Sequence, residues 1–252
     1  MLMLTGYFDE VGQYQDKVQR VNGIAGFIAP AEDWVKFEID WLEYIKDKQY
    51  KDYHDRQIRR KSRERRRNAL LDLLEKYNVL PMGFLVSMDS YHALPQEHKN
   101  CFGDPYYRAY VYCMRFTCSF VNEQQTLEQM RTEKVLTVFD RKKQHFRDKA
   151  LEYYKEWKKK SAFANKMVEE PVFRSADFPP MYAADMLAAI LKEEFERRMY
   201  NIGGSPAKSF ERVYQMAERS LIYPPSDNIP FNFLQSADLN EWIRPYAEGK
   251  VK

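Results

Sequence analysis

The chain is poor in residues on which many protein classes depend. Its 252 residues include only three cysteines, Cys101, Cys113 and Cys118, with neither an even count nor the spacing of zinc ligands. We therefore expect reduced thiols in a cytoplasmic protein. No apolar run approaches the roughly 18 residues of a membrane span. The N-terminus also lacks the basic start and the cleavage site of a signal peptide, so no membrane partner is expected.

Several catalytic signatures are also missing. The sequence contains no glycine-rich phosphate loop, no nucleophile elbow and no paired-histidine metal motif. These absences argue against nucleotide triphosphatases, serine hydrolases and zinc proteases. Large side chains are plentiful instead, since 44% of the residues are hydrophobic and 15% are aromatic. This composition favours one large domain or two small ones with a substantial core, and it excludes global disorder.

Strand and helix patterns alternate along the chain, which predicts an α/β fold. Apolar runs at 2–8, 21–29, 82–88 and 134–139 predict strands, and 171–175 predicts a shorter one. Apolar residues at helical spacing predict helices after Pro30, over Pro105–Phe120, after Asp140 and from Pro179 onward. Turn-forming residues gather at 201–206 and 223–228, where we expect flexible joints.

Three carboxylates stand out by their position in this pattern. Asp9 and Asp140 each follow a predicted strand, and α/β proteins build their sites at the carboxyl ends of strands. Asp185 falls on or beside the apolar stripe of a predicted helix, where a carboxylate must be paired, hydrogen-bonded or bound to a cation. Three such acids could together hold a hard divalent ion. Two ordinary explanations remain open, namely turn or cap roles for Asp9 and Asp140 and an ion pair of Asp185 with a Lys or Arg.

Four segments of the chain resemble the domain of unknown function 3800 family in their order and spacing. They are YFDEVG at 7–12, IAGFIAPAEDWVKFEIDWLEYI at 24–45, VLTVFD at 135–140 and PPMYAADMLAA at 179–189. The resemblance covers about residues 4–200. It implies an α/β fold with a ribonuclease H-like mixed sheet flanked by helices. In addition we expect an inserted basic helix and a C-terminal helical extension.

The same resemblance implies a catalytic site made of acids. Asp9, Asp140 and Asp185 are then the ligands of Mg²⁺ or Mn²⁺, and Glu10 is a further catalytic acid beside Asp9. The implied reaction is the hydrolysis of a phosphodiester bond, in which two metal ions activate water and stabilise the developing charge. The implied domain spans 1–200, with the basic insertion at about 50–77, and 201–252 forms an extension packed on it.

The chain also departs from the family pattern. Val11 stands where the family has Ser after Asp-Glu, and Tyr182 stands where it has Gln before Ala-Ala-Asp. A second copy of the last motif, LQSADL at 234–239, keeps the Gln and makes Asp238 an alternative to Asp185. We favour Asp185, because no long apolar helix follows Asp238.

The basic residues are concentrated in one block of the chain. The overall net charge is only +3, yet the twelve residues Arg56–Arg67 contain eight basic residues and one acid. Such a block attracts phosphate backbones without reading their sequence, so we predict that it binds nucleic acid, either DNA or RNA. A solvated helix face or a docking patch for an acidic protein partner is the alternative. The predicted contacts are Arg56, Arg59, Arg60, Lys61, Arg63, Arg65, Arg66 and Arg67.

Two further residues follow the predicted strand at 82–88. Asp89 could serve as a fourth acid and His92 could transfer a proton or contact a phosphate, although a turn or surface role explains each as well. Two functional hypotheses follow from the sequence. The first is a metal-dependent nuclease. The second is a non-catalytic scaffold subunit, with a degenerate ribonuclease H-like site, that binds nucleic acid or protein.

Overall fold

A computed structural model describes residues 2–12, 20–48, 60–125, 132–140, 144–161, 168–175, 177–219 and 231–234. The elements in chain order are β1 (Leu2–Val11), β2 (Val21–Pro30), α1 (Ala31–Lys48), α2 (Arg60–Leu74), β3 (Leu80–Ser87), α3 (Met88–Ala93), α4 (Gln96–Phe102), α5 (Pro105–Gln125), β4 (Thr132–Asp140), α6 (Gln144–Lys160), β5 (Val172–Arg174), α8 (Pro179–Met199), α9 (Lys208–Arg219) and β6 (Phe231–Leu234). No helix within these segments is long and apolar enough to cross a membrane.

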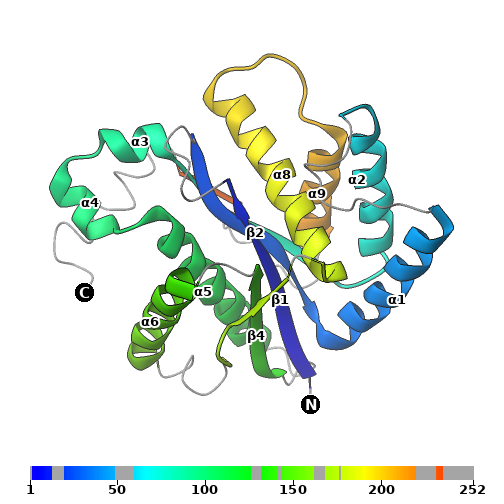
Figure 1. Ribbon diagram of the computed structural model, residues 1–252, viewed down its shortest axis with the longest axis horizontal. Helices are drawn as coiled ribbons and strands as arrows, with labels where there is room; N and C mark the ends of the chain where they lie inside the picture. The colour runs from blue at the N-terminus through cyan, green and yellow to red at the C-terminus, as the bar shows by residue number, and fades with distance from the viewer. Residues whose placement is uncertain are drawn as a thin grey trace.

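The strands form one mixed sheet in the order β5-β4-β1-β2-β3-β6. Strands β1, β2 and β3 make an antiparallel meander. On one side of it β4 runs parallel to β1 and β5 parallel to β4, and on the other side β6 runs parallel to β3. Figure 1 shows β1 and β2 at the centre of this sheet. The α/β prediction with a mixed sheet is therefore confirmed.

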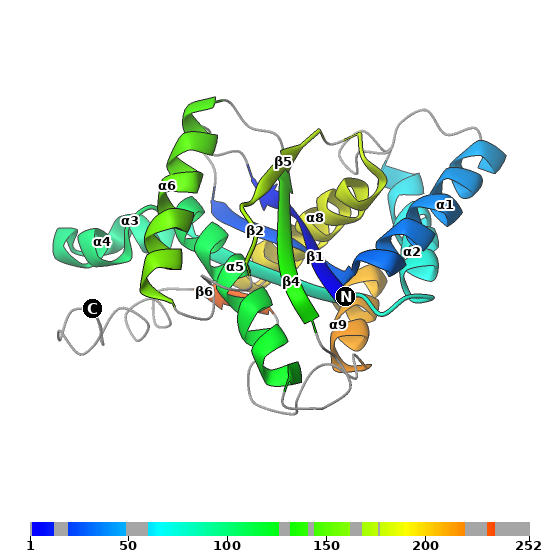
Figure 2. The same cartoon turned by 90° about the horizontal axis from the view of Figure 1, so that it is seen from below.

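Helices cover both faces of the sheet, with α5 and α6 on one face and α1, α2, α8 and α9 on the other (Figures 1 and 2). Successive side chains of a strand point to opposite faces. On β1, Leu4 and Phe8 belong to the core beneath α5, whereas Tyr7 contacts the core beneath α8. Strand β2 is buried at every position, as expected for a central strand covered on both sides.

Helix α1 illustrates how the predicted spacing becomes packing. Trp34, Phe37 and Trp41 recur at intervals of three and four residues, so all three side chains lie on the buried face of the helix. The indole of Trp34 also donates a hydrogen bond of 2.8 Å to the carbonyl oxygen of Thr5 on β1. This bond ties the helix to the strand that carries the candidate acids.

The observed elements differ from the predicted ones in two respects. Strand β1 continues past Phe8 to Val11, because Asp9, Glu10 and Val11 still pair with β2. The sequence patterns also did not predict α3, α4 or β6, whereas α9 falls within the C-terminal extension that was predicted to be helical. Helix α9 buries Phe210 and Val213 against the α8 side of the sheet, and β6 adds a strand to an extension that was expected to be helical. Asp238 lies outside the described residues, and the division into domains stays a prediction.

The close approach of β1 to β2 predicts a strong effect at Gly26. A Cβ atom at this position would clash with the carbonyl oxygen of Tyr7 and with the ring of Phe8. We expect Gly26→Ala to lower the free energy of unfolding by more than about 2 kcal/mol, because a backbone atom cannot move aside as a side chain can. Urea unfolding followed by circular dichroism measures this change.

Gly203→Ala is the matched control, since no described atom lies within 4 Å of a Cβ built there. We expect it to change stability by less than about 0.5 kcal/mol. Equal effects of the two substitutions would contradict the packing of β1 against β2.

Candidate active site

Asp9 and Asp140 lie next to each other on neighbouring parallel strands. Phe8 of β1 pairs with Phe139 of β4, and their stacked rings have centroids 5.3 Å apart. The acids are the next residue on each strand, so their backbones are separated by about 4.8 Å, the spacing of neighbouring strands. Because side chains alternate, both carboxylates lie on the opposite face of the sheet from the phenylalanine rings, the face covered by α8. The structure thus brings these two predicted residues together.

The carboxylate of Asp9 is buried and held in place locally. Only 9% of the residue is exposed, and its Oδ1 accepts a hydrogen bond of 2.7 Å from the backbone N–H of Glu10. Such a bond fixes the direction of the carboxylate. A turn or cap role of Asp9, the alternative to metal binding, also predicts this local contact with the backbone.

Tyr106 lies in the first turn of α5, and its pKa responds to the charges of the candidate acids. Burial raises the pKa of its phenol well above the ordinary value, and the negative charges of Glu10, Asp9 and Asp140 raise it further. The three acids are therefore within electrostatic range of this buried hydroxyl. Sequence reasoning missed Tyr106, because nothing distinguishes it from the other residues of an aromatic-rich helix.

Asp185 lies on the buried side of α8, as predicted, with 7% of its surface exposed. It lines a pocket of about 240 Å³ together with Glu10 and Gly12 from the end of β1. Asp185 of α8 and the end of β1, the strand that carries Asp9, therefore line the same pocket. Its other lining residues are Arg63, Ala188, Ala189, Lys192 and Glu193.

Positive charges also surround this group of acids. Arg63 and Lys192 line the same pocket as Asp185. On the far side of β4, Arg174 of β5 lies directly opposite Asp140 in the strand register, which places the two residues on the same face of the sheet. The sequence analysis did not single out Arg174. These cations can balance buried carboxylates, or they can attract a phosphate.

A metal ion needs ligands that converge on one point. Among the residues that the structure describes, no three His, Cys, Asp or Glu side chains are close enough to hold an ion together. The four predicted acids are all described, so they do not form a complete ligand set of their own. The adjacent pair Asp9 and Asp140 nevertheless fits Mg²⁺, which commonly takes one or two carboxylates and completes its shell with water and substrate phosphate.

The basic block serves partly as a packing surface. Arg67 is buried, and its guanidinium donates two hydrogen bonds, of 2.6 and 2.9 Å, to the carboxylate of Glu193 on α8. Arg63 lies 3.5 Å from the same carboxylate. Glu64, the single acid of the block, accepts hydrogen bonds from the N–H and the hydroxyl of Ser209 on α9. Helix α2 is therefore fixed to α8 and α9 by charged side chains.

The rest of the block is distributed along and before the same helix. Arg65 is exposed and Arg66 is half-buried. The backbones of Arg60 and Lys61 form the start of α2. Arg56 and Arg59 lie outside the described residues.

Asp89 and His92 lie on the short helix α3 and are both exposed. The hydroxyl of Tyr200 donates a hydrogen bond of 3.2 Å to Asp89, and Lys99 donates one to the carbonyl oxygen of His92. Neither residue lines the pocket beside Asp185.

No protein-family model matches the chain, and a search of curated proteins finds no match either.

The ion pair of Arg67 with Glu193 predicts an effect on stability. Glu193→Ala removes the carboxylate that two N–H groups of a buried guanidinium contact. We expect the free energy of unfolding to fall by about 2 kcal/mol, because burying a charge after loss of its partner is costly. Chemical denaturation measures this loss. Glu196→Ala is the matched control on the same helix, since Glu196 pairs with the partly exposed Lys192, and it should cost less than about 1 kcal/mol.

The raised pKa of Tyr106 predicts a dependence of stability on alkaline pH. A raised pKa in the folded state means that the stabilising contribution is complete below the ordinary value of 10 and declines as the pH rises above it. Tyr106→Phe removes this titrating group. Between neutral pH and about pH 11, we expect the wild type to lose more stability than Tyr106→Phe in urea unfolding. Parallel curves for the two proteins would contradict the burial of the Tyr106 phenol and its raised pKa.

Proposed function

We propose that the protein is a divalent-metal-dependent nuclease that hydrolyses phosphodiester bonds. The observation that carries the proposal is the adjacency of Asp9 and Asp140 at the ends of two parallel strands. Glu10 is near the same buried hydroxyl, and Asp185 shares a pocket with Glu10. Two buried acids, Asp9 and Asp185, and two half-buried ones, Glu10 and Asp140, thus lie toward the carboxyl ends of β1 and β4 or on the helix beside them, where α/β proteins build their sites.

The architecture and the sequence motifs support a ribonuclease H-like fold. The mixed sheet with helices on both faces is compatible with such a fold. The motifs that resemble the domain of unknown function 3800 family lie at the end of β1, over β2 and α1, at the end of β4 and at the start of α8. Three of these four motifs carry the acids assigned to the site.

In the proposed reaction Mg²⁺ or Mn²⁺ supplies an activated water and stabilises the charge that develops on the phosphate. Asp9 and Asp140 would hold the ion, and Asp185 would provide a further carboxylate from α8. Tyr106 keeps its proton at neutral pH, and its raised pKa extends this protonated state to more alkaline pH, so the hydroxyl remains a hydrogen-bond donor within electrostatic range of the acids. Glu10, on the wall of the pocket, would act as a base or as an additional ligand.

The substrate requires positive charge, because a cluster of carboxylates repels phosphate. Arg65 is exposed on α2, and Arg174 lies opposite Asp140. We propose these residues, together with Arg66 and the start of the basic block, as the contacts to the nucleic-acid backbone. Arg67 is left out of this surface, since its guanidinium is buried against Glu193.

A specific observation favours the second hypothesis, a scaffold subunit without catalysis. Arg63 and Lys192 line the pocket of Asp185, an arrangement typical of a structural ion-pair network. Tyr182, which replaces the Gln of the family pattern, is buried with its ring centroid 6.3 Å from that of Trp41. In this hypothesis the acids support the fold, and the basic helix binds a nucleic acid or an acidic protein.

Cleavage assays with single amide substitutions separate the two hypotheses. Asp9→Asn, Asp140→Asn and Asp185→Asn each remove one negative charge and keep the shape of the side chain. With Mn²⁺ and labelled DNA or RNA, we expect each to lower the cleavage rate at least about 100-fold, because even residues outside the ligand set change metal-site activity 10- to 100-fold. Asp89→Asn, an exposed aspartate on α3, is the matched control and should cleave like the wild type.

Calorimetric titration of Mn²⁺, with and without a non-cleavable oligonucleotide, provides the second measurement. We expect saturable binding by the wild type that the Asp9→Ala/Asp185→Ala double variant loses. Cleavage that Asp185→Asn leaves undiminished would overturn the assignment of this residue. Equal Mn²⁺ binding by the wild type and the double variant, together with no cleavage, would establish the scaffold hypothesis.

A further inference from the structure

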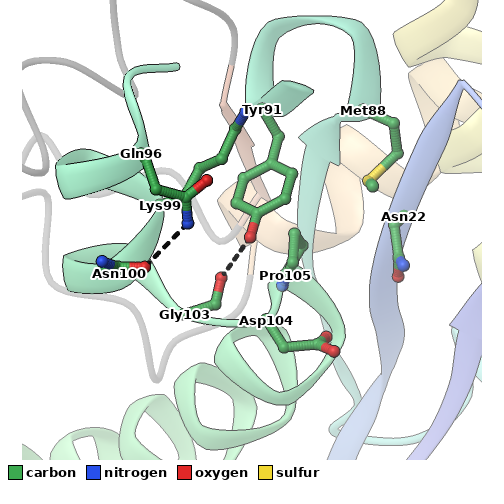
Figure 3. A pocket seen from close by; sticks show the side chains of 9 residues that line it. All are labelled: Asn22, Met88, Tyr91, Gln96, Lys99, Asn100, Gly103, Asp104 and Pro105. Carbon is green, nitrogen blue, oxygen red and sulfur yellow. Dashed lines mark hydrogen bonds between the residues drawn. The ribbon is translucent and has the colours of Figure 1, made fainter. Parts of the chain in front are cut away.

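A second and larger pocket lies on the other face of the sheet, the face covered by α5. Its volume is about 580 Å³, within the range of sites for small organic molecules. Figure 3 shows Asn22 and Met88 on one side of it and Tyr91 on the other, with Asp104 beneath. The remaining lining residues are Gln96, Lys99, Asn100, Gly103 and Pro105.

Asn22 is the residue that points to a ligand. It lies on β2, is only 8% exposed, and presents its side-chain amide to the pocket (Figure 3). Its amide nitrogen and oxygen are not among the described side-chain atoms that are both cut off from solvent and without a hydrogen-bond partner. An amide that lines a pocket can exchange hydrogen bonds with water for hydrogen bonds with a ligand. A ligand in the pocket would provide both a donor and an acceptor for it.

The other walls combine an aromatic ring with polar groups. The hydroxyl of Tyr91 donates a hydrogen bond of 3.0 Å to the carbonyl oxygen of Gly103, which fixes the ring beside the cavity. The carboxylate of Asp104 accepts a hydrogen bond from the N–H of Tyr106 and caps α5. The pocket therefore offers a flat ring, an amide and a carboxylate to one occupant.

The pocket lies at the same edge of the sheet as the candidate active site. Asn22 directly precedes Gly23, which pairs with Val11, two residues beyond Asp9. On the opposite wall Pro105 directly precedes Tyr106, whose phenol is within electrostatic range of Glu10, Asp9 and Asp140. A chain that occupied the acids could thus place a neighbouring group in this pocket.

We propose that the pocket binds one nucleobase of the substrate and that it prefers adenine. The inference rests on the proposed function, which supplies the nucleic acid. An asparagine amide pairs with the N6 and N7 edge of adenine through two hydrogen bonds, and a carboxylate accepts from an exocyclic amino group. The ring of Tyr91 provides the stacking surface on which bases of single strands bind. Asn22 is thus the specificity-determining residue.

Other occupants fit the walls less well. Asp104 repels a phosphate, and Lys99, the only cation among the nine lining residues, already donates a hydrogen bond to the carbonyl oxygen of His92. An apolar ligand would leave the amide of Asn22 unsatisfied. Guanine, thymine and uracil present a carbonyl oxygen where adenine presents its amino group, so the carboxylate of Asp104 disfavours them.

The test compares oligo(dA) with oligo(dT) of equal length, labelled with a fluorophore, in buffer containing EDTA. Because both carry the same phosphate backbone, the basic residues contribute equally and no metal-dependent cleavage occurs. We expect the wild type to bind oligo(dA) about 10-fold more tightly in fluorescence anisotropy, the effect of one good bidentate contact. Asn22→Ala should bind both oligonucleotides equally.

Two further variants keep the test decisive. Asn22→Asp retains the size of the side chain but loses the N–H donor, so it should also lose the preference while its melting temperature stays close to that of the wild type. Asn201→Gly removes an exposed asparagine with a φ of 47°, which glycine adopts without strain, and it should keep the full preference. Equal binding of both oligonucleotides by the wild type, or a preference that Asn22→Asp retains, would overturn the inference.

The source of the base and the proposed function are tested separately. Titration of adenosine monophosphate should give much weaker binding than oligo(dA), and equally tight binding would overturn the assignment to a base within a chain. An Asn22-dependent adenine preference without any Mn²⁺-dependent cleavage would sustain the pocket and reject the nuclease. Cleavage that depends on Asp9, together with equal binding of oligo(dA) and oligo(dT), would support the nuclease and reject the adenine pocket.

Discussion

The parallel pairing of β1 with β4 is the constraint on which the candidate site depends. Its register sets Phe8 against Phe139, and the alternation of side chains then sends Asp9 and Asp140 together to the opposite face. A shift of one residue in either strand would exchange the faces of an acid and an aromatic ring. The stacked rings in the core therefore also fix the positions of the two carboxylates, so that folding and site assembly depend on the same contact.

Helix α8 gives this edge of the sheet its second wall. Fourteen of its residues are buried, because it lies between the sheet and the helices α1, α2 and α9. In that position a charged side chain requires a partner, and the helix carries two buried acids with different surroundings. Glu194 is paired with Arg197 and Arg198, which lower its pKa against the opposing effect of burial. Asp185 faces the pocket at the end of β1.

Much of this arrangement could be predicted from the sequence, because strong periodic patterns determine where strands and helices form. The inward position of Asp185 followed from its apolar neighbours at helical spacing, and the meeting of Asp9 with Asp140 required only that their strands be parallel neighbours. The sequence pattern could not predict that Arg67 and Arg65 differ in burial. One is buried against Glu193 and the other is exposed, and that difference arises from the docking of α2 on α8.

The residues that the sequence did not indicate share a physical cause. Tyr106 and Arg174 matter because of the acids near them, which come from other strands. Asn22 matters because it lines a pocket with residues 88–105, so none of these properties is local to the chain. Strand β6 was not predicted for a similar reason. Its four residues carry little periodic signal, and their conformation depends on pairing with β3.

The pairing of β6 with β3 has a consequence for solubility. Strand β3 is buried at every position, and without β6 one side of its backbone would present unpaired N–H and C=O groups along an apolar strand. Edges of this kind are templates for the addition of strands from other molecules. At the opposite edge the sheet ends in β5, which is only three residues long and carries Arg174, a charge that discourages such addition. With β6 in place, the edge of the sheet is a strand of four residues instead of the eight-residue β3, and short edge strands limit such addition.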